Sequence, residues 1–541
     1  MFSNWPKFKK YRLLILLLVL AVITRFSKLN WGNNLTFHPD ENNMASAVSA
    51  LSWTDLNPNF FAYGQFPLYL AFITIQFLKL FNFNLVIDNF LLSVLILRFW
   101  SALFSFFSVI LVYLIGIQFL NRLQTFLFTI FFTFLPGLIQ LSHFGTTESL
   151  LICCFLAQIY LAQIYLKNQN TKTIFLSAII SGLAISSKIT ALFFILPILI
   201  SILIKTTSIK KLPKYIFHLT FFLFLTSLIF LTTSPFNLLN FPDFISSIQY
   251  ETSVATGKLP VFYTSQFIGT TPFLFQIKSI FPYISGIPLF IFSIFGLVFF
   301  FKKYPKFKIT QKQQLAVILI PSLIYLIYSS QLYVKWTRFM SPIFFLIPLF
   351  ATYFISQIKN QKIQIILSTI SLLPGLLFFT MYLRPDIRLS ASAWVNQNLP
   401  ANSVIFSEAG NVINFPYKNQ NFQITNFDFY NLDTDPDLIS QLPLLISNSD
   451  YIIVPSRRIF KNQNNSRFPY SQKYYQSLFS GQLGFQPLKI FTPSSDFLLN
   501  GENAEETWTV FDHPTIRIYQ NINHFSSDQI QNILLPPDDK T

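Results

Sequence analysis

Long apolar runs alternate with short polar segments over the first 383 residues of the chain. The runs lie at 13–24, 91–120, 123–141, 149–166, 173–186, 190–204, 215–233, 285–301, 315–330, 339–358 and 363–383. A bilayer core about 30 Å thick needs about 20 helical residues, so most of these runs are long enough to cross a membrane. The region 174–204 is interpreted as two short spans broken around Lys188. We therefore expect a polytopic α-helical membrane protein with about eleven transmembrane helices.

The composition agrees with this class. Of the 541 residues, 52% are hydrophobic and 11% are charged, whereas soluble domains carry about 25% charged residues. The net charge of +16 does not indicate a nucleic-acid partner, because the Lys and Arg residues lie in short clusters between apolar runs, as in cytoplasmic loops. The two cysteines, Cys153 and Cys154, are adjacent within an apolar run, which predicts neither a disulfide nor a metal site.

The charge clusters also predict the orientation in the membrane. The basic N-terminus at 7–12 precedes an apolar run without a small-x-small cleavage site, so we interpret 13–24 as an uncleaved first span that leaves the cytoplasm. The apolar segment 66–83 is ambiguous. Placing it on the outer side as an interfacial or re-entrant helix puts the basic loops inside, and the positive-inside rule favours that choice. The expected localisation is the plasma (inner) membrane, with a cytoplasmic N-terminus and an extracytoplasmic C-terminal domain.

With this topology, all acidic residues before the C-terminal region lie on the outer face. They are Asp40, Glu41, Asp55, Asp88, Glu148, Asp243 and Glu251. Carboxylates close to hydrocarbon are costly and suggest function. The first outer loop contains His38-Pro39-Asp40-Glu41, in which the two carboxylates either cap a helix that starts near Pro39 or take part in chemistry. We expect any chemistry on the outer face.

Three cations are predicted to lie on the same face, and each can neutralise a lipid phosphate: Lys188, Lys335 and Arg338. The alternative for Lys335 and Arg338 is an interaction with outer phospholipid head groups. Sugar transfer needs a base that takes the proton of the acceptor, while cations stabilise the departing phosphate. Asp40 is the candidate base, and Glu41 is a second polar or metal-binding group.

Further polar residues are candidates for a substrate pocket. They are His38, His143, Glu148, Glu251 and Tyr263. Glu148 either shares the pocket or caps the span that starts at Ser149. The loop 234–282, which contains Glu251 and Tyr263, either covers a cavity or packs over the helix bundle. A divalent metal could be bound by His38, Asp40, Glu41 and His143, although their spacing does not require one. No other cofactor is predicted, and no nucleotide-binding motif is present.

The chain divides into three regions by composition. Residues 1–384 form the transmembrane domain. From residue 385 to 525, short β-branched runs alternate with helical stretches, which predicts an extracytoplasmic soluble α/β domain. Residues 526–541 are expected to be a polar tail.

Several short motifs resemble those of a known enzyme group. They are Asp40-Glu41, Gln65-Phe66-Pro67-Leu68-Tyr69, Gly145-Thr146-Thr147-Glu148, the stretch from Gly182 to Lys188, and the stretch from Lys335 to Pro342. In order and spacing the chain resembles GT-C type membrane glycosyltransferases of family 39, which include protein O-mannosyltransferases and the aminoarabinose transferase acting on lipid A. The resemblance implies that Asp40 is the base and that a polyprenyl-phosphate sugar is the donor on the outer face. Glu148 occupies a position where Asp is common. The C-terminal domain resembles that of uncharacterised bacterial members, and we expect acceptor recognition there.

The leading hypothesis is an inverting glycosyltransferase that moves a sugar from a polyprenyl-phosphate donor to an acceptor protein, lipid or glycan. Two alternatives stay open. One is a transporter or flippase of a lipid-linked sugar, although no internal repeat supports the symmetry that is typical of transporters. The other is a structural or receptor role of the outer domain on an inactive bundle.

Overall fold

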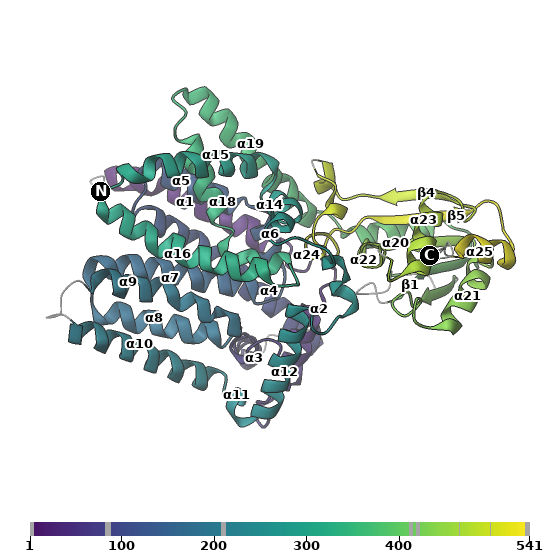
Figure 1. The fold of residues 1–541 in the computed structure, drawn as a ribbon, viewed down its shortest axis with the longest axis horizontal. Coiled ribbons are helices and arrows are strands. Elements are labelled where there is room, and N and C mark those ends of the chain that lie inside the picture. Colours follow the sequence, from purple (N-terminus) through teal and green to yellow (C-terminus); the bar gives the residue numbers. More distant parts are fainter. Residues whose placement is uncertain are drawn as a thin grey trace, which may run out of the picture. The chain divides into compact units, whose positions relative to one another are not determined.

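The computed structural model describes residues 5–81, 88–206, 212–409, 415–417, 422–464, 466–497 and 499–535. These residues form two compact units (Figure 1). The first unit contains Met1–Asn30, Pro39–Ser253 and Pro272–Leu383, and the second contains Trp31–His38, Val254–Thr271 and Arg384–Thr541. The second unit therefore includes two segments that precede residue 384 in the chain. Each unit is described by itself.

The first unit is helical throughout its described part. Its longer helices are α1 (Trp5–Phe26), α2 (Pro39–Ala50), α3 (Gln65–Leu80), α4 (Asn89–Gly116), α5 (Arg122–Thr133), α6 (Pro136–His143), α7 (Glu148–Asn168), α8 (Thr171–Ile185), α9 (Leu196–Lys205), α10 (Leu212–Thr233), α12 (Phe241–Thr256), α15 (Ile287–Lys303), α16 (Ile309–Gln331), α18 (Leu346–Ile355) and α19 (Gln361–Tyr382). Shorter helical segments are η1 (Ile189–Ile195), α11 (Phe236–Leu239), α13 (Leu274–Ser279), α14 (Phe281–Ser285), η4 (Tyr304–Lys306), α17 (Thr337–Met340) and η5 (Ser341–Ile343).

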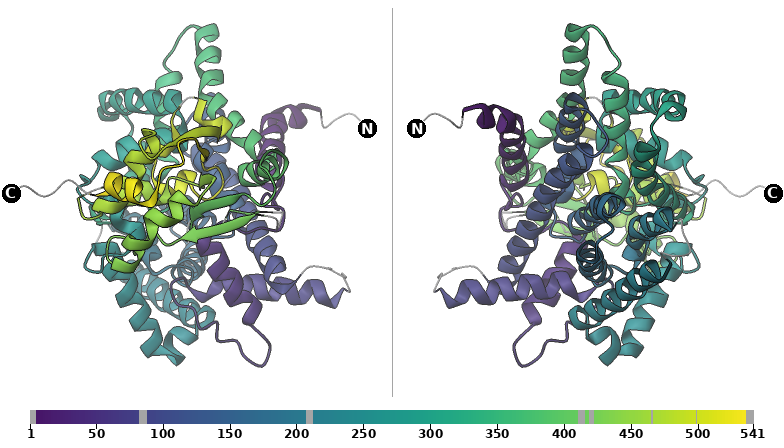
Figure 2. Two further views of the ribbon diagram at one scale, coloured as in Figure 1. Left: turned by 90° about the vertical axis from the view of Figure 1, so that its right-hand side faces the viewer. Right: turned by 90° about the vertical axis from the view of Figure 1, so that its left-hand side faces the viewer.

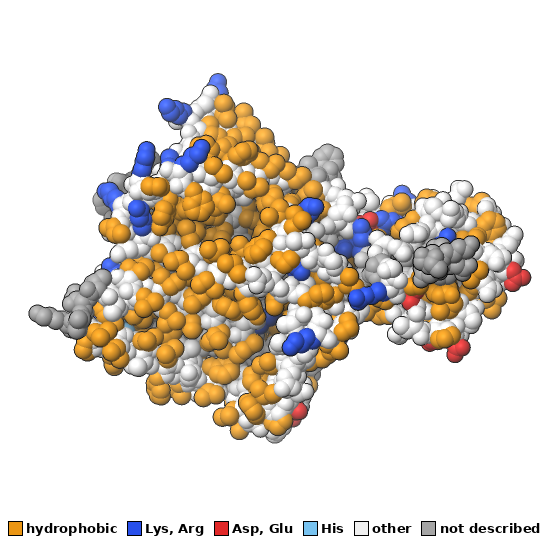
Figure 3. Space-filling view, viewed as in Figure 1, with side chains coloured by type: hydrophobic (Ala, Val, Ile, Leu, Met, Phe, Trp, Pro, Cys, Tyr) orange, Lys and Arg blue, Asp and Glu red, His pale blue; other side chains and the backbone are white. Residues whose placement is uncertain are grey.

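Several of these helices can cross a membrane. Among the described residues, six are long and apolar enough by themselves, or up to eight if each of two bent pairs counts as one span; four further apolar helices are shorter. Only 17% of the most apolar window of α10 and 22% of that of α15 are buried by protein, and hydrophobic side chains cover this surface (Figure 3). Such a surface needs lipid around it, so the chain is an integral membrane protein. All predicted apolar runs lie on these helices, and the count of eleven stays a prediction.

Two of the predicted spans are broken. The run 123–141 forms α5 and α6, which meet at 50°, and the run 339–358 forms the pair Thr337–Ile343 and Leu346–Ile355, which meet at 54°. Pro136 starts α6 directly after the first bend, whereas Pro342 lies in the first turn of η5, before the second bend. Proline lacks an amide donor and is tolerated in the first turn of a helix, so it favours a new start over a straight continuation.

Helix α3, which covers the ambiguous apolar segment, lies crosswise to the bundle. In Figure 1 it is seen end-on, whereas α7, α8 and α10 run across the picture. In Figure 2 it extends sideways while the bundle helices point toward the viewer. With 16 residues it is also shorter than each of the six helices that are long and apolar enough to cross a membrane by themselves. This orientation agrees with a helix that lies along the membrane surface, which is the alternative that the charge pattern favours.

The second unit is built on a five-stranded sheet with the order β2-β1-β3-β5-β4. The strands are β1 (Val404–Glu408), β2 (Gln423–Phe427), β3 (Tyr451–Val454), β4 (Phe485–Phe491) and β5 (Ile516–Asn521). Strand β1 pairs in parallel with β2 and β3, whereas β5 is antiparallel to β3 and β4. The helical segments of this unit are η3 (Phe262–Phe267), α20 (Ile387–Asn398), α21 (Pro436–Ser447), α22 (Arg458–Asn462), α23 (Pro469–Phe479), η6 (Ser494–Phe497), η7 (Gly501–Asn503), α24 (Glu506–Thr509) and α25 (Ser527–Leu534).

Two hydrophobic cores flank the sheet because its strands alternate apolar side chains between both faces. Helix α25 belongs to one of these cores: Ile530 and Leu534 are buried, and the helix packs against α21 and α23. The prediction of a polar tail from residue 526 therefore needs correction for 526–535. Ile533 and Leu534 follow Ile530 by three and four positions, which places the three side chains on one helix face. Residues 536–541 lie outside the described residues.

Candidate functional site

The candidate base Asp40 lies in the first turn of α2, where a carboxylate is favourable. It forms an ion pair with Arg338 of α17, although 298 residues separate the two in the chain. Both side chains are partly accessible, with 18% and 15% of their surface exposed. The guanidinium also lies over the ring of Trp336, with 4.6 Å between its carbon and the ring centroid. The chain therefore brings together the two residues that were predicted to act as base and phosphate-binding cation.

Tyr63 is a third member of this site. Its hydroxyl is hydrogen-bonded to Asp40, and burial raises its pKa well above the usual value, with the nearby Asp40 carboxylate adding to the shift. The neutral phenol therefore persists over the whole physiological pH range and can donate to the carboxylate. The sequence analysis did not single out this residue. Its position two residues before the Gln65-Phe66-Pro67-Leu68-Tyr69 motif is the signal that could have found it.

A second ion pair lies close to the first. Lys188 Nζ is 3.5 Å from Glu148 Oε1, and it lies between the rings of Tyr63 and Phe339, at 5.2 and 5.1 Å from their centroids. Burial lowers the pKa of Lys188, and Glu148 opposes this shift. Lys188 also interacts electrostatically with Arg338 and Asp40. We call Asp40, Tyr63, Glu148, Lys188 and Arg338 the charge cluster. Glu148 both faces Lys188 and starts α7, so the two alternatives for it are compatible.

Backbone contacts between three loops hold the charge cluster in place. Gly64 N and Phe66 N donate to Ser187 O and Ser186 O at 2.9 and 3.2 Å. A Cβ atom on Gly64 would lie only 1.9 Å from Ser186 O, so glycine is required at this approach. Gln65 in turn donates through its backbone to Ser234 Oγ at 3.3 Å and through its side chain to Asn237 Oδ1 at 3.1 Å. The motif that starts at Gln65 thus joins the break at 186–188 to the start of the long outer loop.

Glu41 differs from its neighbour Asp40. Its two oxygens accept from Arg98 Nε and Nη2, both at 2.7 Å, and Oε1 also accepts from Gly145 N at 2.7 Å. The glutamate and arginine side chains are 0% and 1% exposed. These contacts hold α2 to α4 and to the loop before α7, which gives Glu41 a structural role; its catalytic or metal-binding role stays a prediction. From the sequence alone, two adjacent carboxylates do not show which of them pairs with an arginine elsewhere in the chain.

His143 also has a structural environment. Its ring is buried and stacks on Tyr382, with 3.7 Å between the centroids. Nδ1 and Nε2 contact the carbonyl oxygens of Ile139 and Ser27 at 2.7 and 3.0 Å. These contacts place the ring in the packing of the bundle, so a role in the substrate pocket has no support from its geometry.

Two other predicted residues of the first unit retain a functional interpretation. Lys335 is 3% exposed, and within the described part of the chain its ammonium donates only to Tyr333 O, at 3.0 Å, without a carboxylate in ion-pair contact. Burial lowers its pKa. Glu251 of α12 interacts electrostatically with Arg338, Lys188 and Asp40, so the outer segment that carries it lies near the charge cluster.

His38 and Tyr263 belong to the second unit. The His38 ring packs against Phe511, with centroids 4.3 Å apart. Tyr263 lies in η3, where the backbone N–H of Gln266 donates to Asn462 Oδ1 at 3.0 Å. Their assignment to the substrate pocket stays a prediction. Among the described residues, no three side chains of His, Cys, Asp or Glu lie together as a metal site would require.

Residues 67–231 match the family model described as dolichyl-phosphate-mannose-protein mannosyltransferase. The predicted resemblance to membrane glycosyltransferases of this type is confirmed. The mannosyltransferase match includes Glu148 and Lys188, while Asp40 and Arg338 lie outside the matched residues. No curated protein matches the chain in sequence.

Solved structures of membrane glycosyltransferases are similar at low identity. An oligosaccharyltransferase from Archaeoglobus fulgidus, in the apo form, is 12% identical with a TM-score of 0.48, over 87% of this chain and 73% of its own. ArnT from Cupriavidus metallidurans, in the apo state, is 12% identical with a TM-score of 0.43, over 95% and 98%. The arabinofuranosyltransferase AftD from Mycobacteria is 11% identical with a TM-score of 0.41, over 95% and 42%.

Proposed function

We propose that this protein is an inverting glycosyltransferase that uses a polyprenyl-phosphate sugar on the outer face of the membrane. The observation that carries the proposal is the charge cluster, in which two carboxylates and two cations from distant parts of the chain meet. The family match supports the reaction class, since its description names a mannosyltransferase with a lipid-phosphate donor.

In the proposed reaction, Asp40 takes the proton of an acceptor hydroxyl while the acceptor oxygen attacks the anomeric carbon of the sugar. The bond between this carbon and the phosphate oxygen breaks, and the lipid phosphate leaves with the bonding electrons. Arg338 and Lys188 stabilise the charge that develops on this phosphate. Attack from the side opposite to the leaving group inverts the anomeric centre.

Lys335 is proposed as a further cation for the donor phosphate. A buried ammonium without a carboxylate partner is costly, and the sequence places it three residues before Arg338. A phosphate that binds there would supply the missing negative charge. Arg338, which is paired with Asp40, can exchange that partner for the phosphate and leave the carboxylate available as a base.

The proposal is tested with purified protein and a radiolabelled polyprenyl-phosphate sugar in detergent. A transferase releases polyprenyl phosphate and passes the label to an acceptor or to water, and Asp40→Asn stops this release. A flippase leaves the donor intact in both proteins. Intact donor in every condition, together with transport of the labelled lipid across vesicles, would therefore replace the proposed transferase by the transporter.

A further inference from the structure

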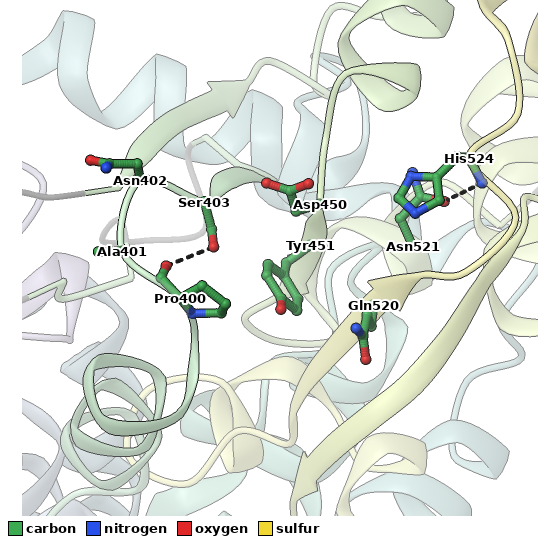
Figure 4. Close-up of a pocket in the computed structure, with 9 residues that line it drawn as sticks. All are labelled: Pro400, Ala401, Asn402, Ser403, Asp450, Tyr451, Gln520, Asn521 and His524. Atoms are coloured by element: carbon green, nitrogen blue, oxygen red, sulfur yellow. Dashed lines mark hydrogen bonds between the residues drawn. The ribbon is translucent and has the colours of Figure 1, made fainter.

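The second unit has a polar groove at one edge of its sheet. The groove lies where β1 and β3 begin and β5 ends, and its cavity measures about 300 Å³ (Figure 4). This volume is at the lower end of the range for small-molecule sites. Seven of its nine lining residues have a polar side-chain group; the lining is Pro400, Ala401, Asn402, Ser403, Asp450, Tyr451, Gln520, Asn521 and His524.

Hydrogen bonds within the unit fix the frame of the groove. Ser403 Oγ donates to Pro400 O at 2.7 Å, which holds the turn before β1. Asp450 Oδ2 accepts from Val404 N at 2.8 Å, so this carboxylate joins β1 to the start of β3. Asn521 Nδ2 donates to Ser449 O at 2.9 Å. Because these contacts are made within the protein, the frame does not depend on contacts with a ligand, which lowers the entropy cost of binding.

Other polar groups of the groove remain available for a ligand. Tyr451 is 7% exposed, and Figure 4 shows its hydroxyl between Pro400 and Gln520. Over the residues that the structure describes, no hydrogen bond joins protein to the Tyr451 hydroxyl, the Gln520 amide or Asp450 Oδ1. None of these atoms is sealed away from solvent. A carboxylate oxygen, an amide and a phenol thus line one small cavity without protein partners.

Ligands of open α/β sheets usually bind at the carboxyl ends of parallel strands. At that edge, Glu408 at the end of β1 accepts from the Tyr475 hydroxyl at 2.6 Å, and Arg458 after β3 pairs with Glu506 at 2.8 Å. These side chains are bound within the protein, whereas the groove lies at the amino ends of β1 and β3.

The chemistry of the lining indicates the class of ligand. Neither Lys nor Arg is among the described residues that line the groove, and the Asp450 carboxylate disfavours a phosphate or a uronic acid. Amides both donate and accept, carboxylates accept, and a phenol does either, which matches a molecule with several neighbouring hydroxyl groups. The flat rings of Pro400 and Tyr451 add apolar surface beside these groups (Figure 4). A neutral sugar residue has this combination of hydroxyl groups and apolar ring faces.

We propose that this groove binds a neutral sugar residue of a glycan, and that the acceptor of the proposed transferase is such a glycan. The identification of this glycan as the acceptor rests on the proposed function, while binding of the sugar residue is independent of catalysis. A peptide acceptor is the competing occupant. It is disfavoured because the described lining holds no Lys or Arg and only Pro400, Ala401 and the Tyr451 ring as apolar surface.

The test is saturation-transfer NMR with the full-length protein in lipid nanodiscs. The probes are neutral disaccharides of glucose, galactose and mannose. The double variant Tyr451→Phe/Gln520→Ala removes two hydrogen-bonding groups and keeps the buried ring, so binding of the preferred disaccharide should weaken about tenfold or more. Gln441→Ala, an exposed polar change on α21 away from the groove, should bind as the unaltered protein does.

The outcomes separate this inference from the proposed function. Disaccharide binding that is lost in the groove variant and retained in Asp40→Asn supports the inference. No binding of any disaccharide, equal binding by the groove variant, or displacement of the disaccharide only by a peptide would overturn it. Sugar release from the lipid donor by Asp40→Asn would instead refute the proposed function, whatever the groove binds.

Discussion

The Asp40 carboxylate is paired with the Arg338 guanidinium, and Tyr63 donates a hydrogen bond to the same carboxylate. A carboxylate with two such partners is a weak base, because both contacts stabilise its charged form. A donor phosphate that draws Arg338 away would make Asp40 more basic at the moment when the leaving group is in place. In this arrangement the donor itself prepares the base.

Replacement of Asp40 by Asn removes the proposed base and keeps the size of the side chain. We expect the rate of sugar transfer to fall about 10²- to 10⁴-fold, with binding of the donor lipid retained or tightened since Arg338 loses its competing partner. Transfer is measured with labelled donor, and binding by titration of unlabelled donor. Asp243→Asn, an exposed change on α12, serves as the control. Comparable rates for both variants would remove Asp40 from the mechanism.

Arg338 is expected to bind the donor more than to position the base. Arg338→Gln should raise the KM for the donor about tenfold or more, since a charge-assisted hydrogen bond to phosphate is lost. Arg338→Lys should show a KM for the donor between those of Arg338→Gln and the unaltered protein, because an ammonium cannot form the planar two-point contact. Steady-state kinetics against donor concentration provide the measurement, with the exposed Arg384→Gln as the control. An unchanged KM in Arg338→Gln contradicts this assignment.

Tyr63 is predicted to hold the Asp40 carboxylate in position. Tyr63→Phe keeps the ring beside Lys188 and removes only the hydroxyl, so transfer should slow about fivefold to tenfold. The pH at which activity rises should shift upward at the same time, since the lost hydrogen bond had stabilised the carboxylate. A pH profile of the transfer rate checks both effects. Tyr250→Phe, at an exposed position of α12, should change neither, and an identical profile for Tyr63→Phe would show that the hydroxyl is dispensable.

The Glu41–Arg98 pair is predicted to act on stability. Glu41→Gln leaves the buried guanidinium without its counter-charge, and the cost of such a change is about 3–5 kcal/mol. The double variant Glu41→Gln/Arg98→Gln should lose less than the sum of the two single losses, because no unpaired charge remains. Unfolding in a denaturing detergent gives these differences. A purely additive result would mean that the two side chains do not depend on each other.

Glu251 is expected to make stability depend on pH. Burial raises its pKa from the ordinary 4.5, against the opposing effect of Arg338 and Lys188. The unfolded chain then ionises at lower pH than the folded one, so stability decreases as the pH rises from about 4.5 through the folded value. Glu251→Gln removes this loss, and its advantage in melting temperature over the unaltered protein should grow from pH 4 toward neutrality. A difference that stays constant with pH would contradict the raised pKa.

The sequence predicted the helical spans well because each apolar run is long and has polar boundaries. It also predicted that Asp40 and Arg338 would meet, since charges are scarce and the positive-inside rule places both on one face. It could not distinguish Asp40 from Glu41, because the partner of Glu41, Arg98, lies inside an apolar run and carries no local signal of its role. The bends after Thr133 and Ile343 and the helix at 527–534 depend on packing partners far away in the chain.

Hydrogen bonds connect the three loops that contain Gly64, Ser186 and Ser234. The backbone N–H groups of Gly64 and Phe66 donate to the carbonyls of Ser187 and Ser186, directly after the end of α8. Gln65 donates to Ser234 and Asn237, at the beginning of the loop 234–282. A displacement of the loop 234–282 would therefore shift Tyr63 and Lys188 together. In the proposed reaction, entry of the acceptor past this loop would then be coupled to retention of the donor.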